Sequence, residues 1–129
     1  MCGIIGIQNN SEAATLAYMG LYAQQHRGQE GAGVVSSDGT VLHRHMGQGL
    51  VSDVFSNSSV IDSLIGDSAI GHVRYSTTGN SDPKNVGPLM FNMGDYSLSI
   101  AHNGNLVNLD EIRKELQENG ALFQTSTDT

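Results

Sequence analysis

A single cysteine lies at position 2, directly after Met1. Removal of Met1 would leave Cys2 with a free α-amine beside its thiol, and α-amino groups have a pKa of about 7.7–8.0. The thiol can then attack an amide carbon while the amine takes the thiol proton and passes it to the departing ammonia. The residue type and its position therefore predict a nucleophile that carries its own base. A small buried side chain is the alternative for a lone cysteine.

Two further positions suit the hydrolysis of an amide. The side chain of Asn103 and the backbone N–H of Gly104 could stabilise a developing oxyanion, although this pair could equally form an ordinary turn with φ above zero. Arg74 could bind a carboxylate through its planar guanidinium, or it could form a surface salt bridge. From the residues alone these alternatives stay open.

Other residue patterns are less promising for chemistry. His43 and His45 alternate along a predicted strand, but no acidic or cysteine partner has the spacing of metal ligands, so we expect no metal site. The segment 31–33 precedes neither a Lys-Ser/Thr pair nor a helix, and is therefore not a phosphate-binding loop. A redox role would need a second, resolving cysteine.

Composition excludes several classes of protein. The 129 residues are enough for one domain with a hydrophobic core. Six Lys and Arg against 13 Asp and Glu give a net charge of −7, which disfavours nucleic acid or an anionic membrane as a partner. The sequence contains neither a long apolar run nor the pattern of a signal peptide. We therefore expect a cytoplasmic domain without an internal disulfide.

The elements that must position these residues are mixed strands and helices. Apolar runs, turn residues and helical periodicity predict the elements. The first part contains a strand over 3–7, a helix over 11–25 with Ser11 as N-cap, a loop over 26–33, and a hairpin around 37–39 with strands over 32–35 and 40–43. The second part contains one or two short helices within 51–65, a strand over 68–74, a loop over 75–87, a hairpin around 94–95 with strands over 89–93 and 96–101, and a helix over 109–119 that starts at Asn108 and stops at Gly120. Hairpins without a regular βαβ alternation indicate an α+β fold.

Five segments occur in the order of a known family. They read Met-Cys-Gly-Ile at 1–4, His-Arg-Gly-Gln-Glu-Gly-Ala-Gly at 26–33, Gly-His-Val-Arg-Tyr-Ser-Thr at 71–77, Ala-His-Asn-Gly-Asn at 101–105 and Ser-Thr-Asp at 126–128. Together they resemble the glutaminase domain of the class II, or N-terminal-nucleophile, glutamine amidotransferases. Gln25, before the second segment, is typical of the branch that transfers ammonia to phosphoribosyl pyrophosphate in the first step of purine biosynthesis.

The resemblance implies a fold and a reaction. The fold would be the four-layer αββα sandwich of N-terminal-nucleophile hydrolases, incomplete in this chain. Residues 1–129 would form the N-terminal portion of the glutaminase domain, without the phosphoribosyltransferase domain and its Mg²⁺. Cys2 would hydrolyse the side-chain amide of glutamine through a thioester. The implied partners are glutamine, the remainder of the amidotransferase chain and further copies in a homo-oligomer.

The resemblance also assigns roles to individual residues. Cys2 matches the family's nucleophile, and Asn103 with Gly104 matches its oxyanion hole. Arg74 and Thr77 match the residues that bind the substrate carboxylate, and Asp128 matches the residue that binds the substrate ammonium group. Arg27 and Tyr75 match supporting residues.

Three alternatives remain to this reading. The chain could be a truncated or unprocessed, non-catalytic fragment, it could be an interaction module of the same family, or it could serve another acceptor such as a sugar phosphate. Because each sheet of this family draws strands from beyond residue 129, we also expect that residues 1–129 alone do not form a stable monomeric glutaminase.

Overall fold

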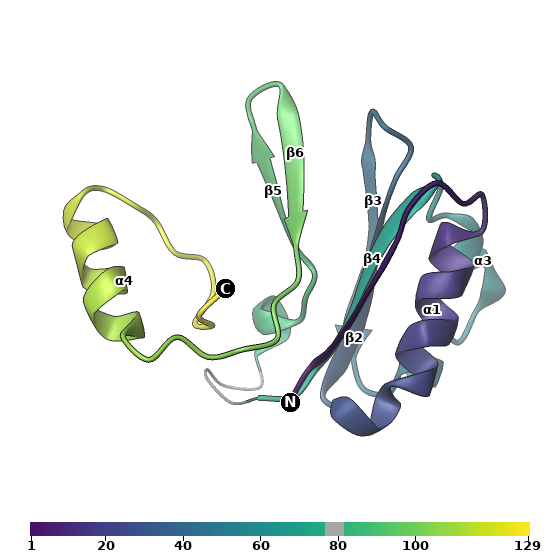
Figure 1. Cartoon of the computed structure of the whole chain (residues 1–129), viewed down its shortest axis with the longest axis horizontal. Helices are drawn as coiled ribbons and strands as arrows, with labels where there is room; N and C mark the ends of the chain where they lie inside the picture. Colours follow the sequence, from purple (N-terminus) through teal and green to yellow (C-terminus); the bar gives the residue numbers. More distant parts are fainter. Residues whose placement is uncertain (77–81) are drawn as a thin grey trace.

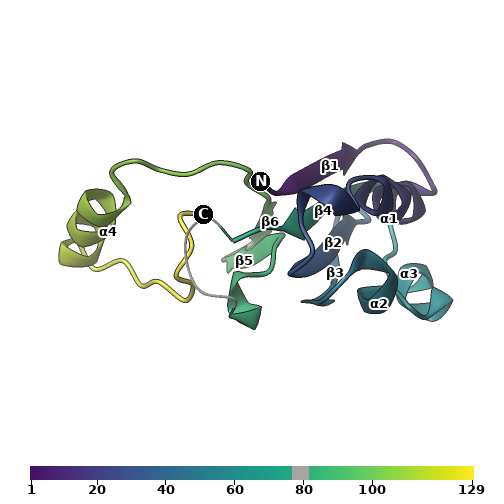
Figure 2. The same cartoon turned by 90° about the horizontal axis from the view of Figure 1, so that it is seen from below.

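An antiparallel sheet of four strands lies at the centre of the computed structural model, which describes residues 1–76 and 82–129. Its strands, in the spatial order β1-β4-β2-β3, are β1 (Gly3–Ile7), β4 (Ser68–Arg74), β2 (Gly31–Ser37) and β3 (Leu42–Gln48). One face of the sheet is covered by α1 (Ala13–Ala23), α2 (Val51–Val54) and α3 (Ser58–Asp62) (Figures 1 and 2).

A hairpin and a helix lie on the other side of the sheet. The hairpin consists of β5 (Leu89–Met93) and β6 (Tyr96–Ile100), and α4 (Leu109–Glu118) stands beyond it (Figure 1). Two short 3-10 helices, η1 (Gln25–Arg27) and η2 (Pro83–Asn85), complete the described elements. The α+β class predicted from the sequence is confirmed as a four-stranded antiparallel sheet with a separate hairpin, whereas the four-layer sandwich stays a prediction.

The hydrophobic core lies between α1 and the central sheet. Ala17 and Leu21 of α1 are fully buried, as are Val34 of β2 and Val73 of β4. Small residues let the helix approach the sheet closely, since a Cβ at Gly20 would overlap the side chain of Ile5. Burial of these apolar side chains is the main stabilising contribution that the described residues make to the fold.

The strand register brings three chemically important segments to one edge of the sheet. Gly3 of β1 pairs with Val73 of β4, so the residue before β1 lies beside the residues that end β4. Gly31 of β2 pairs with Arg74 from the other side, which places the residues before β2 at the same edge. Cys2, Glu30 and the end of β4 are therefore neighbours although they are far apart in the sequence.

Most elements follow the sequence prediction, but two boundaries near the N-terminus were wrong. The loop over 26–33 ends earlier than predicted, because β2 begins at Gly31, one residue before the predicted strand over 32–35, and pairs with both β3 and β4. Its glycines lie close to neighbouring segments. Helix α1 begins at Ala13, after Glu12 and not after Ser11. The Asn10 side chain accepts the backbone N–H of Glu12 at 2.8 Å instead.

The predicted turn at Asn103 and Gly104 was also wrong in its conformation, because neither residue has a positive φ. Further along, Asn108 does precede α4, although its side chain makes no capping hydrogen bond. Gly120 ends the helix with a φ of 90°, as a glycine C-cap should.

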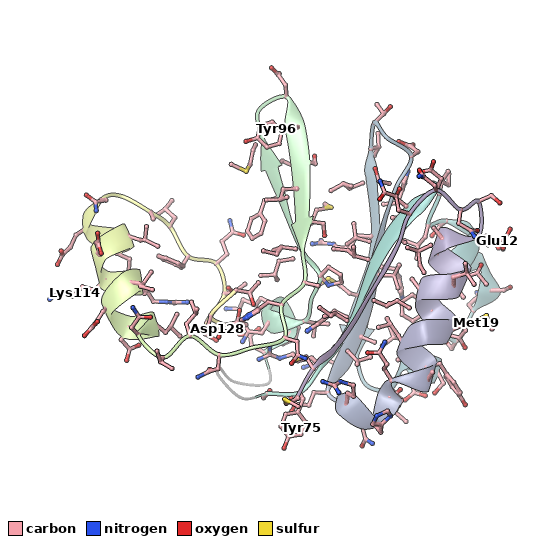
Figure 3. The ribbon with its side chains drawn as sticks, viewed as in Figure 1. Glu12, Met19, Tyr75, Tyr96, Lys114 and Asp128 are labelled. Atoms are coloured by element: carbon pink, nitrogen blue, oxygen red, sulfur yellow. The ribbon has the colours of Figure 1, made fainter. Side chains whose placement is uncertain are left out.

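The hairpin has one face made of apolar side chains. Three cross-strand pairs form this face, namely Leu89 with Ile100, Phe91 with Leu98, and Met93 with Tyr96. Apart from Leu89, these side chains are 42–62% exposed, and Tyr96 projects from the end of the hairpin (Figure 3). Within the part of the chain that the structure describes, no helix has the length and apolar character needed to cross a bilayer.

Candidate active site

Cys2 is held by hydrogen bonds at both its backbone and its thiol. The backbone N–H of Tyr75 donates to Cys2 Sγ at 3.3 Å, and the thiol lies 3.5 Å from the Tyr75 carbonyl oxygen, which can accept its proton. Arg27 donates its Nε–H to the carbonyl oxygen of Cys2 at 3.0 Å. Tyr75 and Arg27, the two residues expected to support the site, therefore both touch Cys2.

The segment around Arg27 is fixed by its own side chains and by close packing. Gln25 donates Nε2–H to the carbonyl oxygen of Gly28 at 2.6 Å, and its Oε1 accepts the backbone N–H of Val51 at 2.7 Å. Gly28 passes so close to β4 that a Cβ there would overlap the carbonyl oxygen of Arg74. Glycine at this position allows the segment to reach Cys2.

Replacement of Gly28 by alanine should destabilise this edge of the sheet. The new Cβ must displace the backbone of β4, and overpacking of this kind costs about 1–3 kcal/mol. We expect Gly28→Ala to lower the free energy of unfolding, measured by urea denaturation, by that amount. Gly6→Ala is the matched control, since a Cβ at Gly6 has no atom within 4 Å. Equal effects of the two substitutions would contradict the close approach of Gly28 to β4.

Arg74 is buried and bonded to backbone. The residue is only 6% exposed, and its Nη1 donates to the carbonyl oxygen of Asn85 at 3.0 Å. The Asn85 side chain in turn donates to Ser126 Oγ at 2.8 Å and accepts the Ser126 backbone N–H at 3.1 Å. The alternative of a surface salt bridge was therefore wrong, because Arg74 lies inside the protein and connects β4 to the C-terminal segment through Asn85.

The side chain of Asp128 is also largely buried. Its side chain is 8% exposed. One carboxylate oxygen accepts the backbone N–H of Leu106 at 2.8 Å, and the other lies 3.7 Å from His102 Nδ1. Asp128 therefore joins the C-terminal segment to the chain that leads from β6 toward α4 (Figure 3).

A cavity of about 30 Å³ lies where these segments meet. Its lining includes Cys2, His72, Arg74, Tyr75, Gly104 and Asp128. Five of the predicted site residues therefore line one cavity, namely Cys2, Arg74, Tyr75, Gly104 and Asp128.

Two predicted site residues stand apart from this cavity, and a third is not among the described residues. Arg27 contacts Cys2 without lining the cavity. Asn103 is exposed and does not line it, although its neighbour Gly104 does. Thr77 lies outside the described residues.

His72 is a cavity residue to which the sequence analysis assigned no role. It lies two residues before Arg74 on the same face of β4, whereas Val73 between them faces the core. That alternation was the signal available in the sequence. His72 is 5% exposed, and burial together with the nearby Arg74 guanidinium lowers its pKa to about 4. His72 is therefore neutral at pH 7.

Burial of His72 should make the protein sensitive to acid. Its pKa is about 4 when folded and about 6.5 when unfolded. The unfolded chain binds more protons between these values, so stability is full above pH 6.5 and falls as the pH drops toward 4. The loss should reach about 3 kcal/mol at most.

Urea unfolding at pH 7 and pH 5 measures this effect. His72→Leu should show a smaller loss between the two pH values than the parent protein, whatever its absolute stability. His26→Leu, at an exposed histidine, should lose as much as the parent. An unchanged pH dependence in His72→Leu would contradict the assignment to His72.

His43 and His45, the two histidines considered as metal ligands, have other partners. His43 Nε2 lies 3.3 Å from Asp38 Oδ2, and His45 Nε2 lies 2.9 Å from the carbonyl oxygen of Val54. Within residues 1–76 and 82–129, no group of three His, Cys, Asp or Glu side chains is placed to hold a metal ion. These residues therefore do not fit the Mg²⁺ that the resemblance associates with phosphoribosyl pyrophosphate.

The fold is that of a known class of domain. The chain belongs to the glutamine amidotransferase domain family, whose model matches residues 58–129. Within class II of that family it corresponds to the N-terminal glutaminase portion of the amidophosphoribosyltransferases. The amidophosphoribosyltransferase of Lacticaseibacillus casei is 46% identical over 128 residues, which cover 99% of this chain and 66% of that protein.

Two solved structures share the fold over the whole chain. The first, described as the allosteric regulatory enzyme of purine biosynthesis, has a TM-score of 0.92 and 47% identity, and the chain covers 28% of it. The second is the glutamine phosphoribosylpyrophosphate amidotransferase of B. subtilis in complex with ADP and GMP, with a TM-score of 0.90 and 45% identity. The chain covers 27% of that structure. It thus spans only part of each relative.

Proposed function

We propose that this chain forms part of a glutaminase that hydrolyses the side-chain amide of glutamine, with Cys2 as the nucleophile. The observation that carries the proposal is the shared cavity, in which Cys2 lies with a buried cation, Arg74, and a buried carboxylate, Asp128. Cys2 Sγ attacks the amide carbon, ammonia leaves and a thioester remains. Water then hydrolyses the thioester to glutamate and restores the thiol.

Arg74 and Asp128 suit the amino-acid end of glutamine, which carries one negative and one positive charge. The Arg74 guanidinium would bind the α-carboxylate, together with Thr77, and the Asp128 carboxylate would bind the α-ammonium group. Both side chains are already oriented by hydrogen bonds to backbone groups. We expect the segments that line this narrow cavity to separate when glutamine binds.

The oxyanion of the tetrahedral intermediate would be stabilised by the backbone N–H of Gly104 and the side chain of Asn103. Gly104 lines the cavity, and the ring of His102 lies where a Gly104 Cβ would be. Glycine at this position therefore allows close packing beside the cavity. Asn103 would have to turn inward from its exposed position.

In the parent enzyme, the ammonia would be transferred to phosphoribosyl pyrophosphate to give phosphoribosylamine. The support for this acceptor is the identity of 45–47% to the two solved structures, of which the second carries glutamine and phosphoribosyl pyrophosphate in its name. The remainder of such an enzyme would supply the acceptor site, and further copies would form a homo-oligomer.

Glutamate release by the Met1-free protein, with the remainder of the amidotransferase chain present, tests the proposal. Glutamine should yield glutamate and ammonia in equal amounts, and Cys2→Ala should yield neither. Arg74→Ala should raise KM for glutamine at least tenfold, because a charge-assisted hydrogen bond contributes about 1.5–3 kcal/mol. Asparagine, one methylene shorter, is the control substrate. Release that survives Cys2→Ala would contradict the proposed function.

A further inference from the structure

Glu30 is the charged residue beside the nucleophile to which neither the sequence analysis nor the proposed function gives a role. It lies between Gly28 and β2, at the sheet edge where Cys2 is found. Its carboxylate accepts the backbone N–H of Ser76 at 2.9 Å through one oxygen and the Ser76 hydroxyl through the other. Its backbone N–H donates to the carbonyl oxygen of Arg74 at 3.3 Å, and its own carbonyl accepts the N–H of Gly49 at 3.1 Å.

Hydrogen bonds of Glu30 go to the two neighbours of Tyr75, and Tyr75 is the residue that contacts Cys2 Sγ. Glu30 is bonded to Arg74 and to Ser76, the residues on either side of Tyr75. Tyr75 in turn directs its backbone N–H and its carbonyl oxygen at Cys2 Sγ. The position of the Tyr75 backbone is therefore set by Glu30, and the orientation of the thiol is set by Tyr75.

The charge of Glu30 is compatible with this position. Burial alone would raise the pKa of Glu30, but the hydrogen bonds from Ser76 and the charges of Arg74 and the N-terminal ammonium group lower it overall. The carboxylate is thus ionised at neutral pH and presents two acceptor oxygens to the two donors of Ser76.

We propose that Glu30 is a positioning residue for the nucleophile: by bonding to Arg74 and Ser76 it holds the Tyr75 backbone against Cys2 Sγ. This inference rests on the proposed function, in which Cys2 attacks the substrate. Glu30 touches neither the sulfur nor the cavity. Its effect should therefore fall on kcat and not on KM.

Two substitutions separate the hydrogen bonds of Glu30 from its charge. Glu30→Gln removes the charge but keeps one acceptor for the Ser76 N–H and gains an amide donor for the Ser76 hydroxyl. Glu30→Ala removes the charge and both contacts. Ser76→Ala keeps the carboxylate and removes one of its two donors. Glu111→Ala, at an exposed glutamate of α4, is the matched control.

The first measurement is hydrogen exchange of the Tyr75 amide, followed by NMR in the full chain. We expect exchange to be at least tenfold faster in Glu30→Ala, as loss of a hydrogen bond to a charged group predicts, and intermediate in Ser76→Ala. Glu30→Gln and Glu111→Ala should match the parent. If Glu30→Ala does not fold, the comparison of Ser76→Ala with the parent still decides the point.

The second measurement is glutamate release, in which Glu30→Ala should lower kcat about tenfold at unchanged KM and Glu30→Gln should restore it. Equal exchange rates in Glu30→Ala and the parent would overturn the inference. Equally fast exchange in Glu30→Ala and Glu30→Gln would also overturn it, because charge alone would then be responsible. If the parent chain releases no glutamate but Tyr75 exchange follows the expected order, the positioning of Tyr75 stands and the proposed function fails.

Discussion

Removal of Met1 is expected to accelerate labelling of Cys2 by a glutamine-like electrophile about 10²–10⁴-fold, the usual contribution of a positioned acid–base group. With Met1 present, the nitrogen of Cys2 is an amide and cannot take the thiol proton. With Met1 removed, the α-amine of Cys2 can do so. A diazoketone analogue of glutamine, with peptide mapping and intact mass, measures the labelling rate for each form.

Iodoacetamide provides the control for this experiment. Its carbon bonds to the sulfur as iodide leaves, without a proton donor, whereas the diazo carbon of the glutamine analogue must take up a proton before N₂ leaves. Iodoacetamide also does not resemble glutamine, so its rate should change far less on removal of Met1. Since the chain has a single cysteine, both reagents report on the same sulfur. Equal labelling of the two forms by the diazoketone would exclude the α-amine as the base.

Asn103→Ala should lower kcat for glutamate release by about 10²–10³ and leave KM nearly unchanged, because an oxyanion donor acts mainly in the transition state. This result requires a change of conformation, because Asn103 is exposed in the described structure and must turn toward the cavity. Steady-state kinetics on the Met1-free chain decide it. Asn105→Ala, two residues along the same segment, should have a much smaller effect.

A change confined to KM would instead place Asn103 at the substrate and leave the oxyanion to other donors. No change at all would remove Asn103 from the site, and the Gly104 N–H would then be the remaining candidate from this segment.

Local signals in the sequence were enough to predict most of the elements. The apolar run of β1, the strand 68–74 and the turn at Gly94 depend on neighbouring residues, and the structure confirms all three. The loop before β2 was predicted to extend too far, to residue 33, because the strand conformation of residues 31–33 depends on partners from β3 and β4. The short sequence Gly-Ala-Gly at 31–33 has no local pattern that indicates such pairing.

The candidate site could likewise be predicted only in part from the sequence. Cys2 could be selected from its chemistry, and Arg74 and Asp128 from the resemblance, but their burial could not. The bond from Arg74 to Asn85 and the two bonds between Glu30 and Ser76 join residues 11 and 46 positions apart. Contacts of this kind follow from strand register and packing, which the sequence does not display directly.

The position of β1 at the edge of the sheet has a consequence for how reliably the nucleophile is presented. Among the described residues β1 pairs with β4 alone, through five residue pairs. Such a strand can detach by local unfolding at a lower free energy than the whole domain requires. The fraction of molecules with Cys2 in place is therefore governed by the fraying of this strand. The contact of Ile5 with Gly20 opposes that fraying, so substitutions at this contact could reduce catalytic competence while the midpoint of global unfolding stays the same.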